Sequence, residues 1–182
     1  MAINLEKGAS LNLSKQSSSL AKVQVGLGWD GADLDLSAFL LKADGKVPSD
    51  GYFVFFNQLS SADGSVVHSG DDREGGDDEG DNEVIEVDLP SVAPQVDRIV
   101  FLANIYDQGV SFGDVSGAYI RIVDASSDTE LVRYDLGEDF SSEVSVLFAE
   151  LYRDGSEWQF RALGQGSQDD LATTCRKYGL NV

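Results

Sequence analysis

Cysteine, histidine and positive charge are all scarce in this sequence. Its 182 residues include one cysteine and one histidine, and 13 lysines and arginines stand against 32 aspartates and glutamates. A single cysteine excludes a disulfide scaffold and a cysteine-based zinc site, and it suits a reducing compartment. The formal net charge of −19 argues against nucleic acid or an anionic membrane surface as a direct partner, because both would repel the chain. The charge favours divalent cations, basic proteins or high solubility.

Long apolar runs are absent as well. No stretch approaches the roughly 18 apolar residues that a membrane span needs. The first residues, MAINLEKGASLNLSK, are amphipathic and lack the basic and then apolar segments of a signal peptide. We therefore expect a soluble, cytoplasmic protein. The length is enough to bury a real core, and we expect one domain over residues 1–182.

Most of the chain carries the pattern of β-strands. Short runs rich in Val, Ile, Phe and Tyr recur between turn sequences such as ADG, DASSD and RDGSE. EVIEVDL and EWQFRAL alternate, which predicts one face toward solvent, whereas RIVFLANIY and AFLL are nearly continuous, which predicts burial on both faces. The predicted fold class is an all-β, two-sheet β-sandwich with short helical additions. Strands are expected near 20–28, 34–41, 52–57, 84–89, 98–106, 118–124, 130–136, 145–152 and 157–163.

One segment near the end of the chain has the pattern of a helix. In SQDDLATTCRKYG, residues 167–179, Ser167 is placed as the N-cap, and basic residues occupy the last turn before a C-cap glycine. Leu171, Cys175 and Tyr178 fall on one stripe, which predicts docking on the body of the protein. Cys175 is then a buried small hydrophobe and not a nucleophile.

The most unusual segment is acidic and glycine-rich. Residues 70–83 read GDDREGGDDEGDNE, in which eight of fourteen residues are carboxylates, four are glycine and Arg73 is the only cation. Calcium takes six to eight oxygen ligands, and glycines let backbone carbonyls turn inward. Without a cation, carboxylates about 5 Å apart repel by roughly 1–3 kcal/mol per pair. A bound divalent cation would remove that repulsion.

Further acids elsewhere in the chain are able to face this segment. GWDGADLDLSAF contributes Asp30, Asp33 and Asp35. In an extended strand Asp33 and Asp35 point to the same side, whereas the leucines that alternate with them point into the core. A shared cation explains two carboxylates on one face, and Asn57, at the end of YFVFFN, offers an amide oxygen.

Other interpretations of these residues stay open. The acidic segment is explained equally by a solvated, disordered loop or by a surface that docks on a basic partner without metal. GVSFG at 109–113 fits the G-x-S-x-G string of serine hydrolases, but a strand and not a helix follows it, and the one histidine, His68, adjoins the acidic segment. His68 either packs beside that segment or lies solvated near its carboxylates.

Several long strings identify a family by resemblance. VGLGWD, DLDLSAFLL, FVFFNQLSSADGSVVHSGDD, GDNEVIEVDL, VDRIVFLANIYD, SFGDVSGAYIRI and ELYRDGSEWQFRALGQG occur in this order. The chain resembles, nearly end to end, the TerD family, the calcium-binding tellurite-resistance and general stress proteins of bacteria. The resemblance implies a β-sandwich that binds calcium through acidic loops.

The family pattern also implies a ligand set. Its D-x-D strand is matched by Asp33 and Asp35, the Asp of its opening GDN by Asp71, and the Asp and Glu of its closing GDDE by Asp81 and Glu83. The candidate metal ligands are Asp30, Asp33, Asp35, Asn57, Asp71, Asp72, Asp78, Asp81 and Glu83.

The chain departs from the family pattern in three places. Only Gly31 and Ala32 separate GLGWD from D-x-D, where family members have several more residues. Asp72 and Asn82 replace an Asn and an Asp of the acidic loop, and that loop is one residue longer. A shortened first loop would weaken or remove one of two calcium positions.

Together these features predict a calcium-binding, non-enzymatic stress or tellurite-resistance protein. Its acidic segments 30–35 and 70–83 would coordinate Ca²⁺ and order a surface for partners, which the resemblance implies are other tellurite-resistance or stress proteins. The alternative is a metal-independent acidic protein–protein interaction module.

Overall fold

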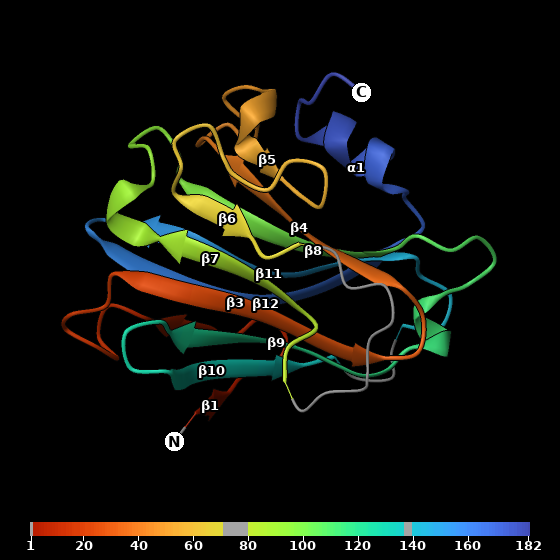
Figure 1. The fold of residues 1–182 in the computed structure, drawn as a ribbon, viewed down its shortest axis with the longest axis horizontal. Coiled ribbons are helices and arrows are strands. Elements are labelled where there is room, and N and C mark those ends of the chain that lie inside the picture. Colours follow the sequence, from red (N-terminus) through yellow and green to blue (C-terminus); the bar gives the residue numbers. More distant parts are fainter. Residues whose placement is uncertain (1, 71–79, 137–139) are drawn as a thin grey trace.

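The protein is an all-β sandwich of two sheets. The computed structural model describes residues 2–70, 80–136 and 140–182, in which each sheet has six strands (Figure 1). The first sheet has the order β1 (Ile3–Asn4), β10 (Thr129–Asp135), β9 (Ser116–Asp124), β3 (Lys22–Asp30), β7 (Glu83–Asp88) and β6 (Val66–His68). The second has the order β2 (Ser10–Asn12), β12 (Glu157–Ser167), β11 (Ser145–Asp154), β8 (Arg98–Ile105), β4 (Leu34–Leu41) and β5 (Phe53–Val54). The predicted fold class is confirmed.

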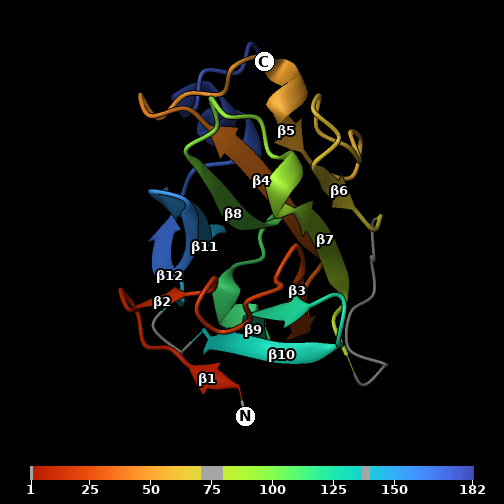
Figure 2. The same ribbon diagram turned by 90° about the vertical axis from the view of Figure 1, so that its left-hand side faces the viewer.

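The helical elements are short. Three 3₁₀ turns cover Asp50–Tyr52, Leu89–Ser91 and Phe112–Asp114, and one α-helix, α1, covers Leu171–Lys177. Within the described residues no helix is long and apolar enough to cross a membrane. The two termini lie at opposite ends of the molecule, the N-terminus beside β1 and the C-terminus beside α1 (Figure 1 and Figure 2).

Hydrophobic patterning explains where each strand lies. β7 and β12 alternate between buried and partly exposed residues, as predicted for strands with one face toward solvent. Every residue of β4 is buried, and so are the six central residues of β8. These two strands are neighbours near one edge of the second sheet, where the sandwich interior covers one face and a second hydrophobic cluster covers the other.

That second cluster lies under α1 on the outer face of the second sheet. Phe39 and Leu41 of β4 pack there with Cys175 and Leu180. Burial raises the pKa of the Cys175 thiol to about 11, as expected of a packed and unreactive cysteine. The prediction that Cys175 is a buried hydrophobe is confirmed.

Four elements differ from the sequence-based expectation. The expected strand at 52–57 is only Phe53–Val54, because a tight turn follows in which Phe55 and Gln58 exchange two backbone hydrogen bonds of 3.0 Å. β1, β2 and β6 were not predicted, since two or three residues are too few to show an alternating pattern.

The helix start also differs. The N-cap of α1 is Asp170, whose side chain accepts a hydrogen bond from the Thr173 N–H at 2.7 Å, and not Ser167. Ser167 is the last residue of β12 and pairs with Ser145, so its backbone is already committed to the sheet.

Candidate metal centre

The D-x-D strand places its aspartates beside a buried surface. Leu34 and Leu36 of β4 pack into the sandwich interior, so Asp35 lies on the outer face of the second sheet, as predicted. Asp35 is only 6% exposed. In register with it stand Asn104 of β8 and then Ser145 of β11, which gives a row of three buried polar residues across the sheet.

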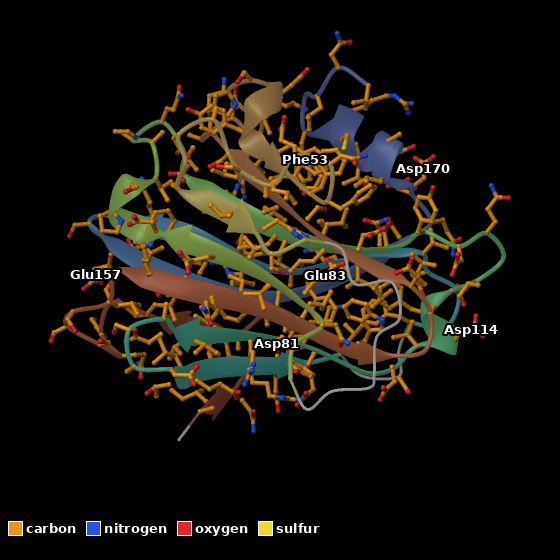
Figure 3. The ribbon with its side chains drawn as sticks, viewed as in Figure 1. Phe53, Asp81, Glu83, Asp114, Glu157 and Asp170 are labelled. Atoms are coloured by element: carbon orange, nitrogen blue, oxygen red, sulfur yellow. The ribbon has the colours of Figure 1, made fainter. Side chains whose placement is uncertain are left out.

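Glu83 reaches the same strand from the other sheet. β5 pairs with β4 only at Ala38 and Phe39, and it ends before Leu36. There the Leu36 N–H donates a 2.7 Å hydrogen bond to Oε2 of Glu83, a side chain that is 1% exposed (Figure 3). A carboxylate from β7 therefore lies beside the edge of β4, one residue after Asp35.

His68 completes this link between the sheets. Its Nε2 lies 2.9 Å from the Leu36 carbonyl oxygen and 3.3 Å from Oε2 of Glu83, and its Nδ1 accepts from the Gly70 N–H at 2.8 Å. Because Nδ1 is an acceptor, Nε2 carries the proton and donates it to the Leu36 carbonyl. His68 thus packs beside the start of the acidic segment, which was one of the two predicted alternatives.

Asp81 lies on a different face of the molecule. Its carboxylate receives hydrogen bonds from Arg121 Nε at 2.8 and 3.0 Å and from the Tyr119 hydroxyl at 2.9 Å. Tyr119 and Arg121 alternate with the buried residues of β9 and so face outward from the first sheet. Asp81 also packs against Gly26, where any Cβ would overlap its carboxylate. The structure therefore does not bring Asp81 to Asp35.

At this outer site Arg121 forms ion pairs with both Asp81 and Glu130. The hydrogen bond that the Arg121 guanidinium donates to Asp81 raises the pKa of Arg121; burial opposes this effect, and the hydrogen bond donated to Glu130 adds to it. Burial, followed by the negative charge of Asp81, raises the pKa of Tyr119 to about 12. Asp81 is thus paired with a permanent cation.

The remaining candidates are less informative. Asp30 ends β3 and is exposed, and Asn57 is exposed in the turn that follows β5. Asp33 directly precedes β4, and its Oδ1 is inaccessible to solvent. Asp71, Asp72 and Asp78 lie outside the described residues.

The donor chemistry at β4 suits a hard divalent cation. Asp35 and Glu83 offer carboxylate oxygens, which calcium prefers over imidazole or thiolate. Residues 2–70, 80–136 and 140–182 contain no group of three or more His, Cys, Asp or Glu side chains placed to hold a metal by themselves. A calcium ion there would need further oxygens besides these carboxylates.

Two residues of this region were not predicted as part of a site. His68 was considered only as a neighbour of the acidic segment, and Asn104 was not singled out at all. A signal for Asn104 exists, because it is the one polar side chain inside the apolar run IVFLANIY. A polar residue within a strand that is buried on both faces requires a hydrogen-bond partner.

Comparisons with known proteins agree with this architecture. The profile of the TerD domain family matches residues 1–178. The tellurium resistance protein TerD of Serratia marcescens is 49% identical over 192 residues, and general stress protein 16U of Bacillus subtilis is 46% identical over 193; both alignments cover 100% of each chain. A solved protein of unknown function aligns with a TM-score of 0.72 at 26% identity, covering 90% of this chain and 99% of the other. A Streptomyces coelicolor homologue of TerD aligns with a TM-score of 0.70 at 24% identity, covering 86% and 96%.

Proposed function

This chain belongs to the TerD domain family, and we propose that it is a calcium-binding, non-enzymatic protein of tellurium resistance or general stress response. The observation that carries the calcium proposal is that the buried carboxylate of Glu83, from β7, accepts a hydrogen bond from the Leu36 N–H of β4, one residue after the buried Asp35. Asp35 and Glu83 come from different sheets and are 48 residues apart in the sequence.

The physical argument rests on desolvation and repulsion. A buried carboxylate loses its hydration, and this loss must be offset by hydrogen bonds or by a cation. The Leu36 N–H and His68 compensate Glu83 in part. We propose that a divalent cation bound to Asp33, Asp35 and Glu83 contributes to this compensation.

Two groups of residues would then hold the ion. Asp33, Asp35 and Glu83 are the ligands proposed from the described part of the chain, and Asp71, Asp72 and Asp78 supply the further oxygens that calcium needs. Asp81 would have to leave Arg121 to join them, so we assign it to that ion pair. The function of the ion is to order the acidic segment into a surface that partner proteins recognise.

A role without catalysis is supported by Ser111, the serine of the G-x-S-x-G string. Its side chain caps the 3₁₀ turn Phe112–Asp114 and donates to the Ser141 carbonyl oxygen at 2.8 Å. The segment after that turn is strand β9 and not a helix, so the chain does not form a nucleophile elbow there. His68, the last residue of β6, is buried, and its two ring nitrogens form hydrogen bonds with the backbone of Leu36 and Gly70.

Family membership also motivates a proposal for partners and location. We propose that the ordered acidic surface binds other tellurium-resistance or stress proteins in the cytoplasm. The competing function is an acidic interaction module that needs no metal. A direct measurement of calcium binding distinguishes the two functions.

Calcium titration tests the proposal. Chelator-stripped protein is titrated with Ca²⁺ and separately with Mg²⁺ in a calorimeter, and its melting temperature is measured at each end point. At a hundredfold excess over Kd, calcium should stabilise the fold by about 2.7 kcal/mol. That gain corresponds to a rise of roughly 5–10 °C in melting temperature for a chain of this size.

The matched variants are Asp33→Asn with Asp35→Asn, and Asp154→Asn as a control. The double change removes two ligands and should abolish most of the calcium shift, whereas Asp154 is exposed in the β11–β12 turn and should leave the shift unchanged. Calcium binding that survives the double change would show that the D-x-D strand is not the site.

A further inference from the structure

A cavity of about 290 Å³ lies on the outer face of the second sheet, over β4, β8, β11 and β12. Its polar lining consists of Arg98, Glu150, Arg161, Gln165 and Tyr178, the last of which directly follows α1. The volume is close to the lower end of the range of small-molecule sites, about 300 Å³. Of the proposed calcium ligands, none that the structure describes is among the lining residues. A site here is therefore separate from the proposed calcium site.

Two arginines share one carboxylate in this cavity. Glu150 is buried, and its Oε1 lies 3.1 Å from Nη1 of Arg161, whereas its Oε2 lies 3.9 Å from Nη1 of Arg98. The outer face of the first sheet has the opposite balance, because Arg121 pairs there with two acids. Two guanidinium groups and one carboxylate leave an excess of one positive charge in the cavity. This local excess, on a molecule of net charge −19, favours a ligand with a single negative charge.

The turn beside the cavity does not cancel this charge. Gly45 lines the cavity, and its neighbour Asp44 pairs with Lys42 at 3.2 Å. Lys46, on the other side of Gly45, donates its ammonium group to the Lys177 carbonyl oxygen and forms no ion pair among the described residues. The turn therefore adds positive charge near the cavity.

The unpartnered groups of the cavity are hydrogen-bond donors. The guanidinium of Arg98 forms no hydrogen bond with any described residue, because 3.9 Å from Glu150 is too far for one. The Arg98 side chain is 39% exposed, so a ligand can reach its terminal nitrogens even though its Nε is inaccessible to solvent. An acceptor with negative charge satisfies such donors best.

Tyr178 adds a donor beside these charges. Burial raises the pKa of Tyr178, the positive charge of Arg98 opposes this effect, and the negative charge of Glu150 adds to it. The hydroxyl thus lies near both groups and stays protonated at neutral pH. It has no hydrogen-bond partner among the described residues.

The rest of the lining is aliphatic. It consists of Leu41, Val100, Leu147 and Leu163, all of which belong to the second hydrophobic cluster or pack against it. A hydrocarbon group placed on these side chains would remove apolar surface from water. An inorganic anion would gain nothing from them.

We propose that this cavity binds a small aliphatic carboxylate. The carboxylate accepts hydrogen bonds from the terminal nitrogens of Arg98 and from the Tyr178 hydroxyl, since a guanidinium group matches the two oxygens of a carboxylate. The hydrocarbon body packs against the aliphatic lining. Glu150 stays paired with Arg161 and repels a second negative charge, which disfavours phosphate and dicarboxylates. This inference goes beyond the proposed calcium function and does not depend on it.

Titration with sodium pentanoate in chelator tests the proposal, and the NMR signal of the buried Arg98 Nε–H group reports binding. Pentanoate replaces chloride at a constant ionic strength of about 0.1 M, so that screening does not change. We expect saturable binding with a Kd of about 1–10 mM, as is reasonable for so small a ligand. Acetate lacks most of the hydrocarbon body and should bind at least about fivefold more weakly. Neutral pentanamide should bind at least about tenfold more weakly.

Three outcomes of this titration would overturn the proposal. Pentanamide that binds as tightly as pentanoate would show that the guanidinium does not anchor the ligand. Inorganic phosphate that binds as tightly would show a general oxyanion site with no use for a hydrocarbon body. Absence of saturation by pentanoate up to about 50 mM would show that the cavity has no such site.

Three variants locate the ligand. Arg98→Met removes the guanidinium donors and should weaken pentanoate binding at least about tenfold, measured from the backbone amide signals of the lining residues. Tyr178→Phe removes only the hydroxyl and should weaken binding severalfold, because the ring still packs on Phe39 at 4.7 Å between centroids. Arg133→Met is the matched control, since Arg133 lies on β10 of the first sheet with a side chain that is 32% exposed. It should leave the affinity unchanged.

Circular dichroism checks the fold of each variant, and Tyr178→Phe decides the question if Arg98→Met does not fold. Equal losses in Arg98→Met and Arg133→Met would show a general effect of net charge and reject the site. Pentanoate affinity that is unchanged in both Arg98→Met and Tyr178→Phe would also reject it. Calcium affinity should be the same in Arg98→Met as in the wild type, which keeps the two proposals apart. A loss of calcium affinity in a folded Arg98→Met would show that the change is not confined to the cavity and would overturn the assignment.

Discussion

At the scale of single residues, neighbouring carboxylates in one acidic string have different roles. Asp81 faces outward and pairs with Arg121, whereas Glu83 faces inward and closes the edge of β4 through the Leu36 N–H. The two are separated only by Asn82, whose side chain accepts from the Trp29 N–H at 2.9 Å. Local composition therefore does not indicate which acids are structural and which are available for a cation.

The first prediction concerns Glu83. Glu83→Ala leaves the buried Leu36 N–H without its acceptor and removes the carboxylate beside His68, so in chelator it should lower the free energy of unfolding by about 2–4 kcal/mol. Glu83→Gln keeps an acceptor oxygen and should cost less than half as much. Urea unfolding measures both.

The control lies on the same strand. Glu86 is partly exposed and forms a surface ion pair with Lys22, so Glu86→Ala should change stability by no more than about 0.5 kcal/mol. Equal losses for Glu83→Ala and Glu86→Ala would mean that the hydrogen bond from Leu36 to Glu83 contributes no more to the free energy of unfolding than a surface ion pair does.

At the scale of elements, an aspartate caps the start of α1, just after β12. The Asp170 side chain accepts from the Thr173 N–H. The pKa of Asp170 lies below its usual value, chiefly because of a hydrogen bond with the Thr173 side chain and next because of the one from the Thr173 N–H. A lowered pKa in the folded state means stability that is present above the unfolded pKa and lost as pH falls through the folded pKa. The cap should therefore fail only below about pH 4.

Replacement of that cap gives the second prediction. Asp170→Ala should lower the melting temperature by a few degrees at pH 7, and the difference from the wild type should shrink as the pH falls below 4. Ser167→Ala is the matched control, because Ser167 ends β12 and only accepts a 3.2 Å hydrogen bond from the Asp169 N–H. A larger fall in melting temperature for Ser167→Ala than for Asp170→Ala would indicate that Ser167 caps the helix.

At the scale of the whole molecule, the net charge of −19 dominates the electrostatics. Self-repulsion of this size destabilises the compact state, and salt screens it over a Debye length of about 10 Å at 0.1 M. The same acidity draws cations to the surface generally, so specific sites must be separated from screening.

Salt dependence gives the third prediction. In chelator, raising NaCl from about 0.05 M to about 0.5 M should raise the melting temperature by several degrees, because screening relieves the repulsion. Calcium at about 1 mM adds little ionic strength, so any rise it produces reports binding at a site. A melting temperature that is independent of NaCl would show that self-repulsion does not limit stability.

The sequence by itself determined the architecture. Alternation in EVIEVDL and EWQFRAL, and continuous apolar runs in RIVFLANIY and AFLL, predicted which strands have one buried face and which have two, and the structure confirms this. It also predicted that Asp35 points away from the core. These features depend on a period of two residues, which is local and can be read along the chain.

Only the tertiary structure decided how the polar residues are combined. Arg121 meets Asp81 across 40 residues, Glu83 meets Leu36 across 47, and Asn104 stands between Asp35 and Ser145 because three strands pair in one register. Such contacts are set by strand order and by the packing of two sheets, and no local pattern encodes them. The cavity beside Arg98 arises in the same way, because four strands and the residue after α1, from distant parts of the chain, line it together.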